Sequence, residues 1–393
     1  MMLPVTPRGF KDVLPEEARW RENITTKVKQ AFELWGYAPI ETPTLEVLEV
    51  LEQGGVLPEK PFRLFDTDNE LLVLRPDVTL PVARMVASRL DAQTLPLRFR
   101  YVHRVFREEE SLRAAAREYT QIGVESLGMV GPAADAEVLL LFIDALNACG
   151  LKDFTVAFCT VGVLCELLTA AQAANNLNEQ WVEQVLAAFH ASNLVAIDQL
   201  TSSERINERY GSVIRTLGTI NGGREAIEKV RSLVEPLGCL DGLDELMATW
   251  DIVEGLGYSD KARIDFSVMS TFDYYTGLVI EAYAPGVGTA IGTGGRYDTM
   301  LEAYGKSAPA AGFAFCLESV MHALLAQGCT DTTSEDDAAA CVELALPAFE
   351  SEQNASDAGA KDATAKTIEI FQEALSLRAQ GTPAVLNMPR RSL

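Results

Sequence analysis

Two segments of alternating hydrophobicity, joined by a charged stretch, constrain the fold of this chain more than any other feature. In Leu97 to Arg107, odd positions are mostly apolar and arginines occupy most even ones. In Glu118 to Leu127, one face carries aliphatic and hydroxyl side chains, and the other carries polar side chains and a glycine. A period of two places successive side chains on opposite faces of a strand. We therefore predict two antiparallel strands, connected by the charged, alanine-rich loop Glu108 to Arg117.

A helix is well marked before these strands. Pro15 suits the first turn of a helix, and Gly36 supplies a stop. Between them, apolar side chains follow helical spacing at Trp20, Ile24, Val28, Phe32 and Trp35. The next run, Tyr37 to Pro43, is extended and limited by prolines, which predicts an edge strand or an interface arm.

Helical periodicity dominates the middle of the chain. Pro132 to Ala148 has the pattern of a helix closed by Gly150. From about Cys165 to Tyr258, amphipathic stripes follow one another without strand character, which predicts a helical insertion of about ninety residues. Strand patterns return after it at Ala262–Phe266, Gly277–Ala284 and Gly312–Cys316. We expect the strands on both sides of the insertion to form one antiparallel sheet flanked by helices, an α+β fold.

The last part of the chain, residues 326–393, differs from the core that we assign to residues 1–325. Its segments Asp331 to Asp337 and Glu350 to Ala365 are acidic or rich in small polar residues, which favours loops. Around them lie a predicted strand, helix and strand at Val342–Leu346, Thr367–Gln380 and Ala384–Leu386. A single β-α-β unit is too small to be stable alone, so we expect it to pack on the core or on a partner.

The net charge limits the class of partner. Asp and Glu number 56 against 33 Lys and Arg, so the chain carries −23 at pH 7. Proteins that bind a phosphate backbone usually present a basic surface. This balance argues against DNA or RNA as the main partner, unless the few arginines cluster sharply.

Neither a membrane nor a metal site is indicated. Residues 1–8 lack the apolar core of a signal peptide, and the longest strongly apolar stretch, Val138 to Ile143, is too short to span a bilayer. Seven widely spaced cysteines without a C-x-x-C pattern are typical of reduced thiols. Three histidines offer few ligands for a metal centre. These features predict a cytoplasmic protein without a metal.

The first predicted strand concentrates positive charge. Arg98, Arg100, Arg104 and Arg107 lie within ten residues that contain no acidic side chain. In an otherwise acidic chain, this cluster forms either a solvated strand face or an anion-binding surface.

The second predicted strand offers Gln121, Gly123 and Glu125 on one face. A glycine between two polar side chains lets a ligand approach the sheet, and Glu125 can hold an ammonium group. The alternative is an exposed polar strand face.

Other motifs have ordinary structural interpretations beside functional ones. Asp77 and Thr79 follow a strand-like run and suit helix capping. Tyr274 and Tyr275 precede a strand and suit core or interface packing at least as well as ligand contact. Gly286 to Gly292 has the wrong spacing for a dinucleotide site and favours a turn between antiparallel strands, so we expect no cofactor.

Taken in order, these motifs resemble those of histidyl-tRNA synthetases, which belong to the class II aminoacyl-tRNA synthetases. The matching segments are Arg8–Pro15, Phe106–Glu109, Gln121–Glu125, Asp273–Gly277, Gly294–Asp298 and Ala311–Phe315. The arm that ends at Pro43 resembles their dimer-forming first motif. The match covers about residues 6–325 and is specific, because five separate motifs occur in order, with Phe106–Glu109 and Gln121–Glu125 counted as one motif and its return strand. It implies the antiparallel sheet of class II synthetases.

Departures from the synthetase pattern bear on function. Ser319 and Ser270 stand where synthetases carry arginines, the first of which stabilises ATP phosphates. Asp77 and Val78 replace a glutamate and a glycine, and the loop that meets ATP and the tRNA end contains only alanines at residues 114–116. Loss of two cations that face developing phosphate charge is expected to slow adenylate formation by orders of magnitude. The anticodon-binding domain is reduced to one β-α-β unit.

A chain that keeps the histidine-pocket residues of a synthetase but lacks the residues for adenylate formation is similar to the family of ATP phosphoribosyltransferase regulatory subunits. The segment Leu74 to Arg84 is also closer to that family than to true synthetases. The resemblance implies a non-catalytic protein that activates a short-form catalytic subunit in a hetero-octamer. It also implies feedback inhibition by histidine in the first step of histidine biosynthesis, and a homodimer formed through the synthetase-like interface.

The resemblance also implies a histidine site. Its residues are Asp77, Thr79, Arg107, Gln121, Glu125, Tyr274 and Tyr275. In this hypothesis, Glu125 and Gln121 bind the polar groups of histidine, and one of the two tyrosines packs on its ring. The positive stretch from Arg98 to Arg107 then belongs to the inherited pocket rather than to a nucleic-acid surface.

Two other functions remain open. The chain can be an active histidyl-tRNA synthetase or a divergent amino-acid ligase, which histidine-dependent ATP–pyrophosphate exchange would reveal. It can also be an adaptor that binds only protein, in which case calorimetry would show no heat with histidine.

Overall fold

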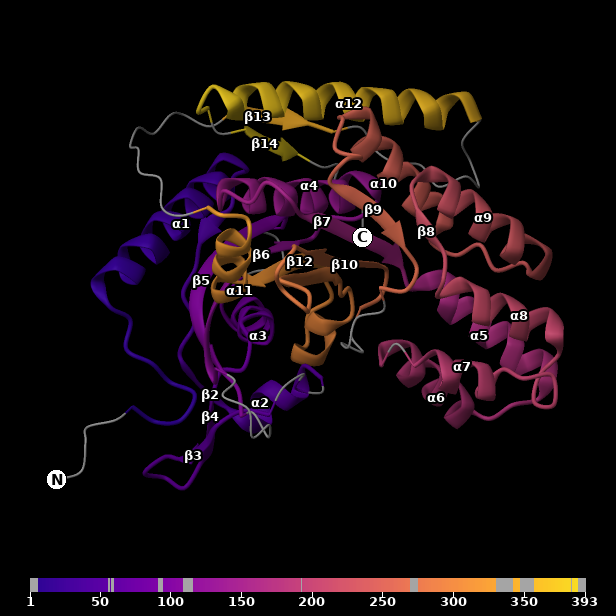
Figure 1. The fold of residues 1–393 in the computed structure, drawn as a ribbon, viewed down its shortest axis with the longest axis horizontal. Helices are drawn as coiled ribbons and strands as arrows, with labels where there is room; N and C mark the ends of the chain where they lie inside the picture. Colours follow the sequence, from indigo (N-terminus) through magenta and orange to yellow (C-terminus); the bar gives the residue numbers. More distant parts are fainter. Residues whose placement is uncertain are drawn as a thin grey trace.

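The computed structural model describes residues 6–55, 57, 60–90, 95–108, 116–191, 193–268, 275–329, 342–346, 357–382 and 384–387. A nine-stranded sheet runs through its centre (Figure 1). In spatial order, its strands are β1 (Ala38–Pro39), β5 (Leu97–Phe106), β6 (Glu118–Leu127), β12 (Ala310–Cys316), β11 (Gly292–Arg296), β10 (Leu278–Tyr283), β7 (Thr155–Thr160), β9 (Ala262–Asp265) and β8 (Asn221–Gly222). The pairs β1–β5 and β7–β9 are parallel, and the other six are antiparallel. The predicted α+β fold is confirmed.

The hairpin predicted from the two alternating segments is the pair β5–β6. Its ladder runs without a break from Leu97 opposite Leu127 to Phe106 opposite Glu118. Of the predicted connecting loop, residues 109–115 lie outside the described residues. The register follows from the pattern, because a slip of one residue would move every apolar side chain to the other face.

Helices α1 and α4 cover one face of the sheet, and helix α11 (Leu317–Ala326) packs on β6 and β12 in the same apolar cluster. Helix α1 (Pro15–Leu34) begins at the predicted proline, and Gly36 follows its end with a φ of +81°. Helix α4 (Pro132–Ala148) has the predicted bounds and is buried on most sides, because other helices cover it from outside (Figure 1). Phe142 of α4 stacks on Phe313 of β12, with ring centroids 4.2 Å apart.

A smaller sheet and a second group of helices pack on the opposite face of the hairpin. They are β2 (Leu45–Val47), α2 (Leu48–Gln53), β3 (Arg63–Phe65), β4 (Leu71–Leu74), α3 (Thr79–Arg89) and η3 (Met300–Tyr304). The small strands were not predicted as a sheet, because three or four residues are too few to show a period. The segment before them forms β1 at the sheet edge, as the prolines of Tyr37 to Pro43 predicted.

Between β7 and β9 the chain is mostly helical. The helices are α5 (Gly162–Asn175), α6 (Glu179–His190), α7 (Leu194–Leu200), α8 (Glu208–Leu217), α9 (Arg224–Val234), η2 (Glu235–Leu237) and α10 (Leu243–Gly255). Strand β8 also lies in this stretch and pairs with β9, so the segment from Cys165 to Tyr258 is not purely helical. Two residues of strand are too short to leave a trace in the sequence pattern.

The C-terminal unit contains β13 (Val342–Ala345), α12 (Asp357–Ala379) and β14 (Ala384–Asn387). The two strands pair in parallel, as expected for a β-α-β unit. The prediction of a loop over Glu350 to Ala365 is wrong from Asp357 onward, where α12 has already begun. Alanine-rich sequence favours helix, and this preference outweighs the polar residues among the alanines.

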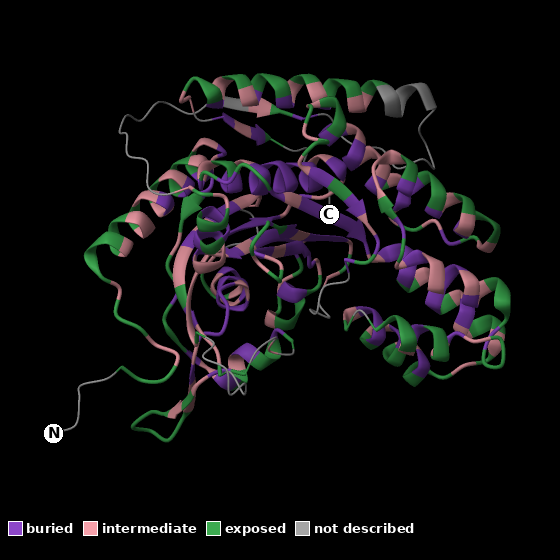
Figure 2. Cartoon of the chain, viewed as in Figure 1, coloured by how far each residue is buried: buried purple, intermediate pink, exposed green. Residues whose placement is uncertain are grey.

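Buried residues concentrate in the central sheet and on the helix faces that pack against it (Figure 2). One large apolar cluster lies between the sheet and the helices α1 and α4, and a second cluster lies between β5 and α3. Among the described residues, no helix is both long and apolar enough to cross a membrane.

Candidate functional site

A pocket lies on the face of the sheet opposite α1 and α4. Ile122 and Val124 of β6 belong to the large apolar core, so the alternate side chains Gln121 and Glu125 point to the other face. There they line a pocket of about 430 Å³, including its open side. The other lining residues are Asp77, Thr79, Arg107, Tyr275, Thr293, Gly294, Tyr297, Gly312, Phe313 and Ala314.

Glu125 is 2% exposed, and three hydroxyl groups donate to it. Its Oε1 accepts from Thr79 over 2.9 Å and from Tyr101 over 3.2 Å, and its Oε2 accepts from Tyr297. Burial raises the pKa of Glu125 to about 8; the charge of Asp77 adds to the shift, and the bonds from Thr79 and Tyr101 oppose it. A carboxyl group held in this way ionises readily when a cation enters the pocket, so it suits an ammonium ligand.

Two glycines on neighbouring strands make room for this arrangement. Gly123 lies opposite Tyr101 in the ladder, and Gly312 lies opposite Glu125. A Cβ at Gly312 would lie 2.3 Å from Glu125 Oε2, and one at Gly123 would lie 2.5 Å from the Tyr101 hydroxyl oxygen. The gap predicted at Gly123 therefore exists, but the Tyr101 hydroxyl fills it, and the expected approach of a ligand at this position is wrong.

Three further side chains complete the polar wall of the pocket. Asp77 caps α3 as predicted, because its Oδ1 accepts from the backbone N–H of Leu80 over 3.3 Å. The Nε of Arg107 donates to the carbonyl oxygen of Pro76 over 3.1 Å. The side-chain oxygen of Gln121 is buried without a hydrogen-bond partner in the described part of the chain. Buried acceptors are normally satisfied, so this oxygen is suited to an N–H donor of a ligand.

The structure brings together six of the seven residues predicted for a histidine site. The six are Asp77, Thr79, Arg107, Gln121, Glu125 and Tyr275. Tyr274 lies outside the described residues. The prediction missed Tyr101 and Tyr297, both of which donate to Glu125. Tyr297 belongs to the Gly294–Asp298 motif, which was a signal for it, whereas Tyr101 resembles any apolar residue of an alternating strand.

The four arginines from Arg98 to Arg107 do not share one surface; the first three lie in β5, and Arg107 directly follows it. Arg98 is 8% exposed and pairs with Glu137 of α4, with 2.7 Å between its Nε and Glu137 Oε1. Arg104 is exposed and pairs with Glu118 across the hairpin. Of the four, only Arg107 lines the pocket. The expectation that this stretch as a whole belongs to the pocket is wrong, because the even positions of the strand face away from it.

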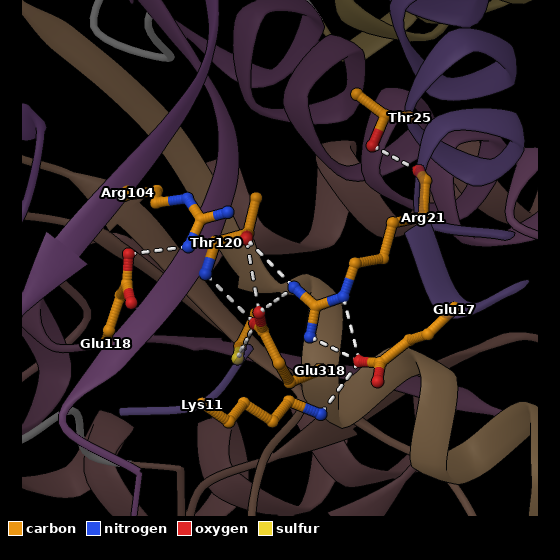
Figure 3. A network of polar contacts seen from close by, with 9 residues as sticks. Lys11, Glu17, Arg21, Thr25, Arg104, Glu118, Thr120 and Glu318 are labelled. Atoms are coloured by element: carbon orange, nitrogen blue, oxygen red, sulfur yellow. Dashed lines mark hydrogen bonds and ion pairs between the residues drawn. The ribbon is translucent and has the colours of Figure 1, made fainter. Parts of the chain in front are cut away.

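A polar network joins the first turn of helix α11 (Leu317–Ala326), which follows β12, to α1 and the hairpin (Figure 3). Glu318 accepts from Nη1 of Arg21 over 2.6 Å and from the backbone N–H of Thr120 over 2.9 Å. Arg21 also donates to Glu17 over 2.8 Å, and Lys11 donates to Glu17 over the same distance. Burial alone would raise the pKa of Glu318, but its donors hold that pKa below the ordinary value. The charged groups beside the Ala311–Phe315 motif are therefore paired within the chain.

The residues described here offer no metal site, since no three His, Cys, Asp or Glu side chains among them lie close enough to hold an ion. The turn predicted at Gly286 to Gly292 connects the antiparallel strands β10 and β11. The polar side chains that line the pocket carry carboxyl, amide, hydroxyl and guanidinium groups.

Comparisons with known proteins define the class of fold. The sequence model of the histidyl-tRNA synthetase family matches residues 9–320. A histidyl-tRNA synthetase structure from Nostoc sp. PCC 7120 is similar with a TM-score of 0.71 at 23% identity, covering 100% of this chain and 88% of that one. The fold is that of a class II histidyl-tRNA synthetase.

Sequence relatives define the family within this class. The ATP phosphoribosyltransferase regulatory subunit of Moorella thermoacetica is 35% identical over 334 residues, which cover 84% of this chain and 83% of that protein. The regulatory subunit of Bacillus subtilis is 33% identical over 319 residues, or 81% of each chain. A crystal structure from Bacillus halodurans, described as an ATP phosphoribosyltransferase regulatory subunit/histidyl-tRNA synthetase, has a TM-score of 0.76 at 30% identity and covers 99% of this chain and 93% of its own. The chain belongs to the family of ATP phosphoribosyltransferase regulatory subunits.

Proposed function

We propose that this chain is the regulatory subunit of ATP phosphoribosyltransferase in histidine biosynthesis and is not itself a catalyst. Membership of the family supports this assignment. A regulatory subunit acts on a separate catalytic chain, and we infer that this chain is the short-form catalytic subunit. That subunit joins ATP to phosphoribosyl pyrophosphate, the first step of the pathway.

We further propose that histidine binds the pocket as a feedback effector. The observation that carries this proposal is the buried Glu125, which accepts from three hydroxyl groups and lies beside a Gln121 oxygen that has no hydrogen-bond partner among the described residues. Histidine offers both an ammonium group and an imidazole N–H to such a pair. A nucleotide phosphate would instead meet the Asp77 carboxylate, which repels anions, and would not favour ionisation of Glu125.

The seven predicted residues receive the following roles in this proposal. Glu125 and Gln121 bind the nitrogen groups of histidine, and Tyr275 or Tyr274 packs on its ring. Asp77 and Thr79 complete the polar wall, in which Thr79 also orients Glu125 through their 2.9 Å hydrogen bond. Arg107 lines the same pocket and suits the ligand carboxylate.

Regulation then follows from a coupling free energy between two sites. Histidine stabilises one arrangement of the interface with the catalytic subunit, and by linkage the substrates of that subunit change histidine affinity by the same factor.

We propose a homodimer through the synthetase-like interface, a hetero-octamer with the catalytic chains and a cytoplasmic location. We also propose residues 1–325 as the core and residues 326–393 as its extension.

The decisive experiment adds this chain to a purified short catalytic subunit and measures phosphoribosyl transfer with and without histidine. We expect the catalytic subunit to become more active with the chain and less active when histidine is then added. Failure to change the rate in either direction would overturn the proposal. Histidine-dependent ATP–pyrophosphate exchange by the isolated chain would instead identify an active synthetase.

A further inference from the structure

The C-terminal unit packs closely on the core, over α4 and α10 (Figure 1). Two core glycines lie directly beneath its side chains. A Cβ at Gly255, the last residue of α10, would lie 2.5 Å from Cδ1 of Ile368, and one at Gly36 would lie 2.0 Å from Cγ2 of Val385. The unit therefore occupies space that side chains larger than glycine would take.

Arg378, in the last turn of α12, is buried against four core residues that we call the arginine socket: Leu34, Trp35, Glu137 and Asp144. Arg378 is 8% exposed, and its Cζ lies 3.4 Å from the centre of the Trp35 ring. Its Nε donates to the carbonyl oxygen of Leu34 over 3.3 Å. The carboxylates of Glu137 and Asp144 attract the guanidinium from the core side. Cation–π contact, hydrogen bond and charge thus converge on one side chain.

A second arginine reaches the unit from the core. Arg98 of β5 donates to the carbonyl oxygen of Leu386, while Nη2 of Arg378 donates to that of Ala384 over 2.7 Å. Ala384 and Leu386 are alternate residues of β14, so their carbonyl groups point to the same side. The carbonyl oxygen of Asn387 points the other way, toward β13, where it accepts from the backbone N–H of Leu346. Two arginines therefore close the outer edge of β14.

The formal charges of this cluster balance when the unit is docked. The core supplies Arg98, Glu137 and Asp144, which sum to −1, and Arg378 of the unit supplies the compensating +1. Buried charges are strongly unfavourable without a partner. Withdrawal of the unit would leave these core side chains with one negative charge that no cation balances.

The same strands carry this docking site and the pocket, on opposite faces. Arg98 lies opposite Ser126 in the β5–β6 ladder, and Ser126 directly follows Glu125. Glu125 of the pocket is therefore the neighbour, along β6, of the residue that pairs with Arg98. Arg98 in turn binds the carbonyl oxygen of Leu386. A shift of the hairpin at Arg98 displaces Glu125 as well, because adjacent residues of one strand move together.

We propose that the C-terminal unit is a latch on the back of the ligand site: docking of Arg378 in the arginine socket holds the β5–β6 hairpin, so docking and ligand binding stabilise each other. The identity of the ligand, histidine, rests on the proposed function, whereas the docking does not. Reciprocity requires that any change in docking which alters histidine affinity be matched by an effect of histidine on docking.

Two variants of the full chain weaken docking in different ways. Arg378→Met removes the charge and its hydrogen bonds, and Gly255→Leu places a side chain against Ile368 without touching the socket. Arg224→Met is the matched control, because Arg224 pairs with Asp251 and Glu254 on the surface of the insertion. Hydrogen exchange follows the peptides 367–382 and 118–127, and calorimetry follows histidine binding.

We expect both variants to speed exchange in 367–382 at least tenfold, to speed exchange in 118–127 and to weaken histidine binding by about fivefold or more, within the range usual for coupled sites. The control should change none of these. Unchanged exchange in 367–382 would overturn the latch, and faster exchange there with unchanged exchange in 118–127 would overturn its link to the pocket. Absence of histidine heat in the unaltered protein would refute the proposed function, while the two exchange measurements would still decide the latch.

Discussion

Replacement of Glu125 by glutamine tests the ligand site directly. The amide has nearly the shape of the carboxyl group and can still accept from the Thr79 and Tyr101 hydroxyls, so the fold of the pocket should persist. What the substitution removes is the negative charge that faces the ligand ammonium. The variant therefore separates charge recognition from the packing of the pocket.

The size of the effect follows from two opposing contributions. A hydrogen bond to a charged group contributes about 1.5–3 kcal/mol. Because the pKa of Glu125 is about 8 in the empty pocket, ionising it at pH 7 costs about 1.4 kcal/mol. If the hydrogen bond contributes about 3 kcal/mol, subtracting the ionisation cost leaves a net contribution to histidine binding of about 1.6 kcal/mol at pH 7. This corresponds to roughly tenfold in the dissociation constant. At pH 6 the ionisation cost rises to about 2.7 kcal/mol, so the two proteins should bind almost equally.

Isothermal titration calorimetry at pH 6, 7 and 8 measures this difference. Glu118→Gln is the control, because Glu118 lies on the same strand but pairs with Arg104 on the surface. We expect Glu125→Gln to bind histidine about tenfold more weakly at pH 7, with a larger difference at pH 8. Equal affinities at all three pH values, with the control also unchanged, would refute the role of Glu125 as the ammonium site.

Three further perturbations test other parts of this description. At pH 7, histidine binding should release up to about one proton, because Glu125 is largely protonated in the empty pocket and ionised beside an ammonium group. Calorimetric titration in buffers of different ionisation enthalpy should show this release, and the Glu125→Gln variant should lack it. Arg98→Met should lower the free energy of unfolding in urea by about 3–5 kcal/mol, because it leaves a buried carboxylate unpaired; the exposed Arg104→Met should lower it by less than about 1 kcal/mol, and equal losses would contradict the burial argument. Gly123→Ala should lower the thermal midpoint and weaken histidine binding, because its Cβ meets Tyr101 and a backbone carbonyl; a destabilisation outside about 1–3 kcal/mol would point to a different packing.

The hairpin shows how far local pattern reaches. Alternation from Leu97 to Leu127 predicted both strands and their pairing, because a period of two requires one buried face and one polar face. The start of α1 at Pro15 and its stop near Gly36 follow from backbone properties of those two residues alone. The strands β2, β3 and β4 escaped prediction because their few residues carry no measurable period.

The site was partly predictable for a different reason. Ordered motifs identified six residues of the pocket through resemblance, since a fold family keeps its ligand positions in fixed places along the chain. The same method left out Tyr101 and Tyr297, whose contribution is a hydroxyl aimed at Glu125. The direction of a single hydroxyl depends on packing across several strands, which no local pattern records.

By itself, the sequence determined the class of the fold, the central hairpin and the family, because periodicity and motif order are properties of the chain read along its length. Only the tertiary structure determined which charged side chains are paired in the interior and which line the pocket. Arg98 and Glu125 look alike in sequence, as polar members of alternating strands, yet one pairs with Glu137 beneath the C-terminal unit and the other lies in the pocket. The difference arises because the environment of a charge is set by residues that folding brings to it, here from α4, α3 and β14.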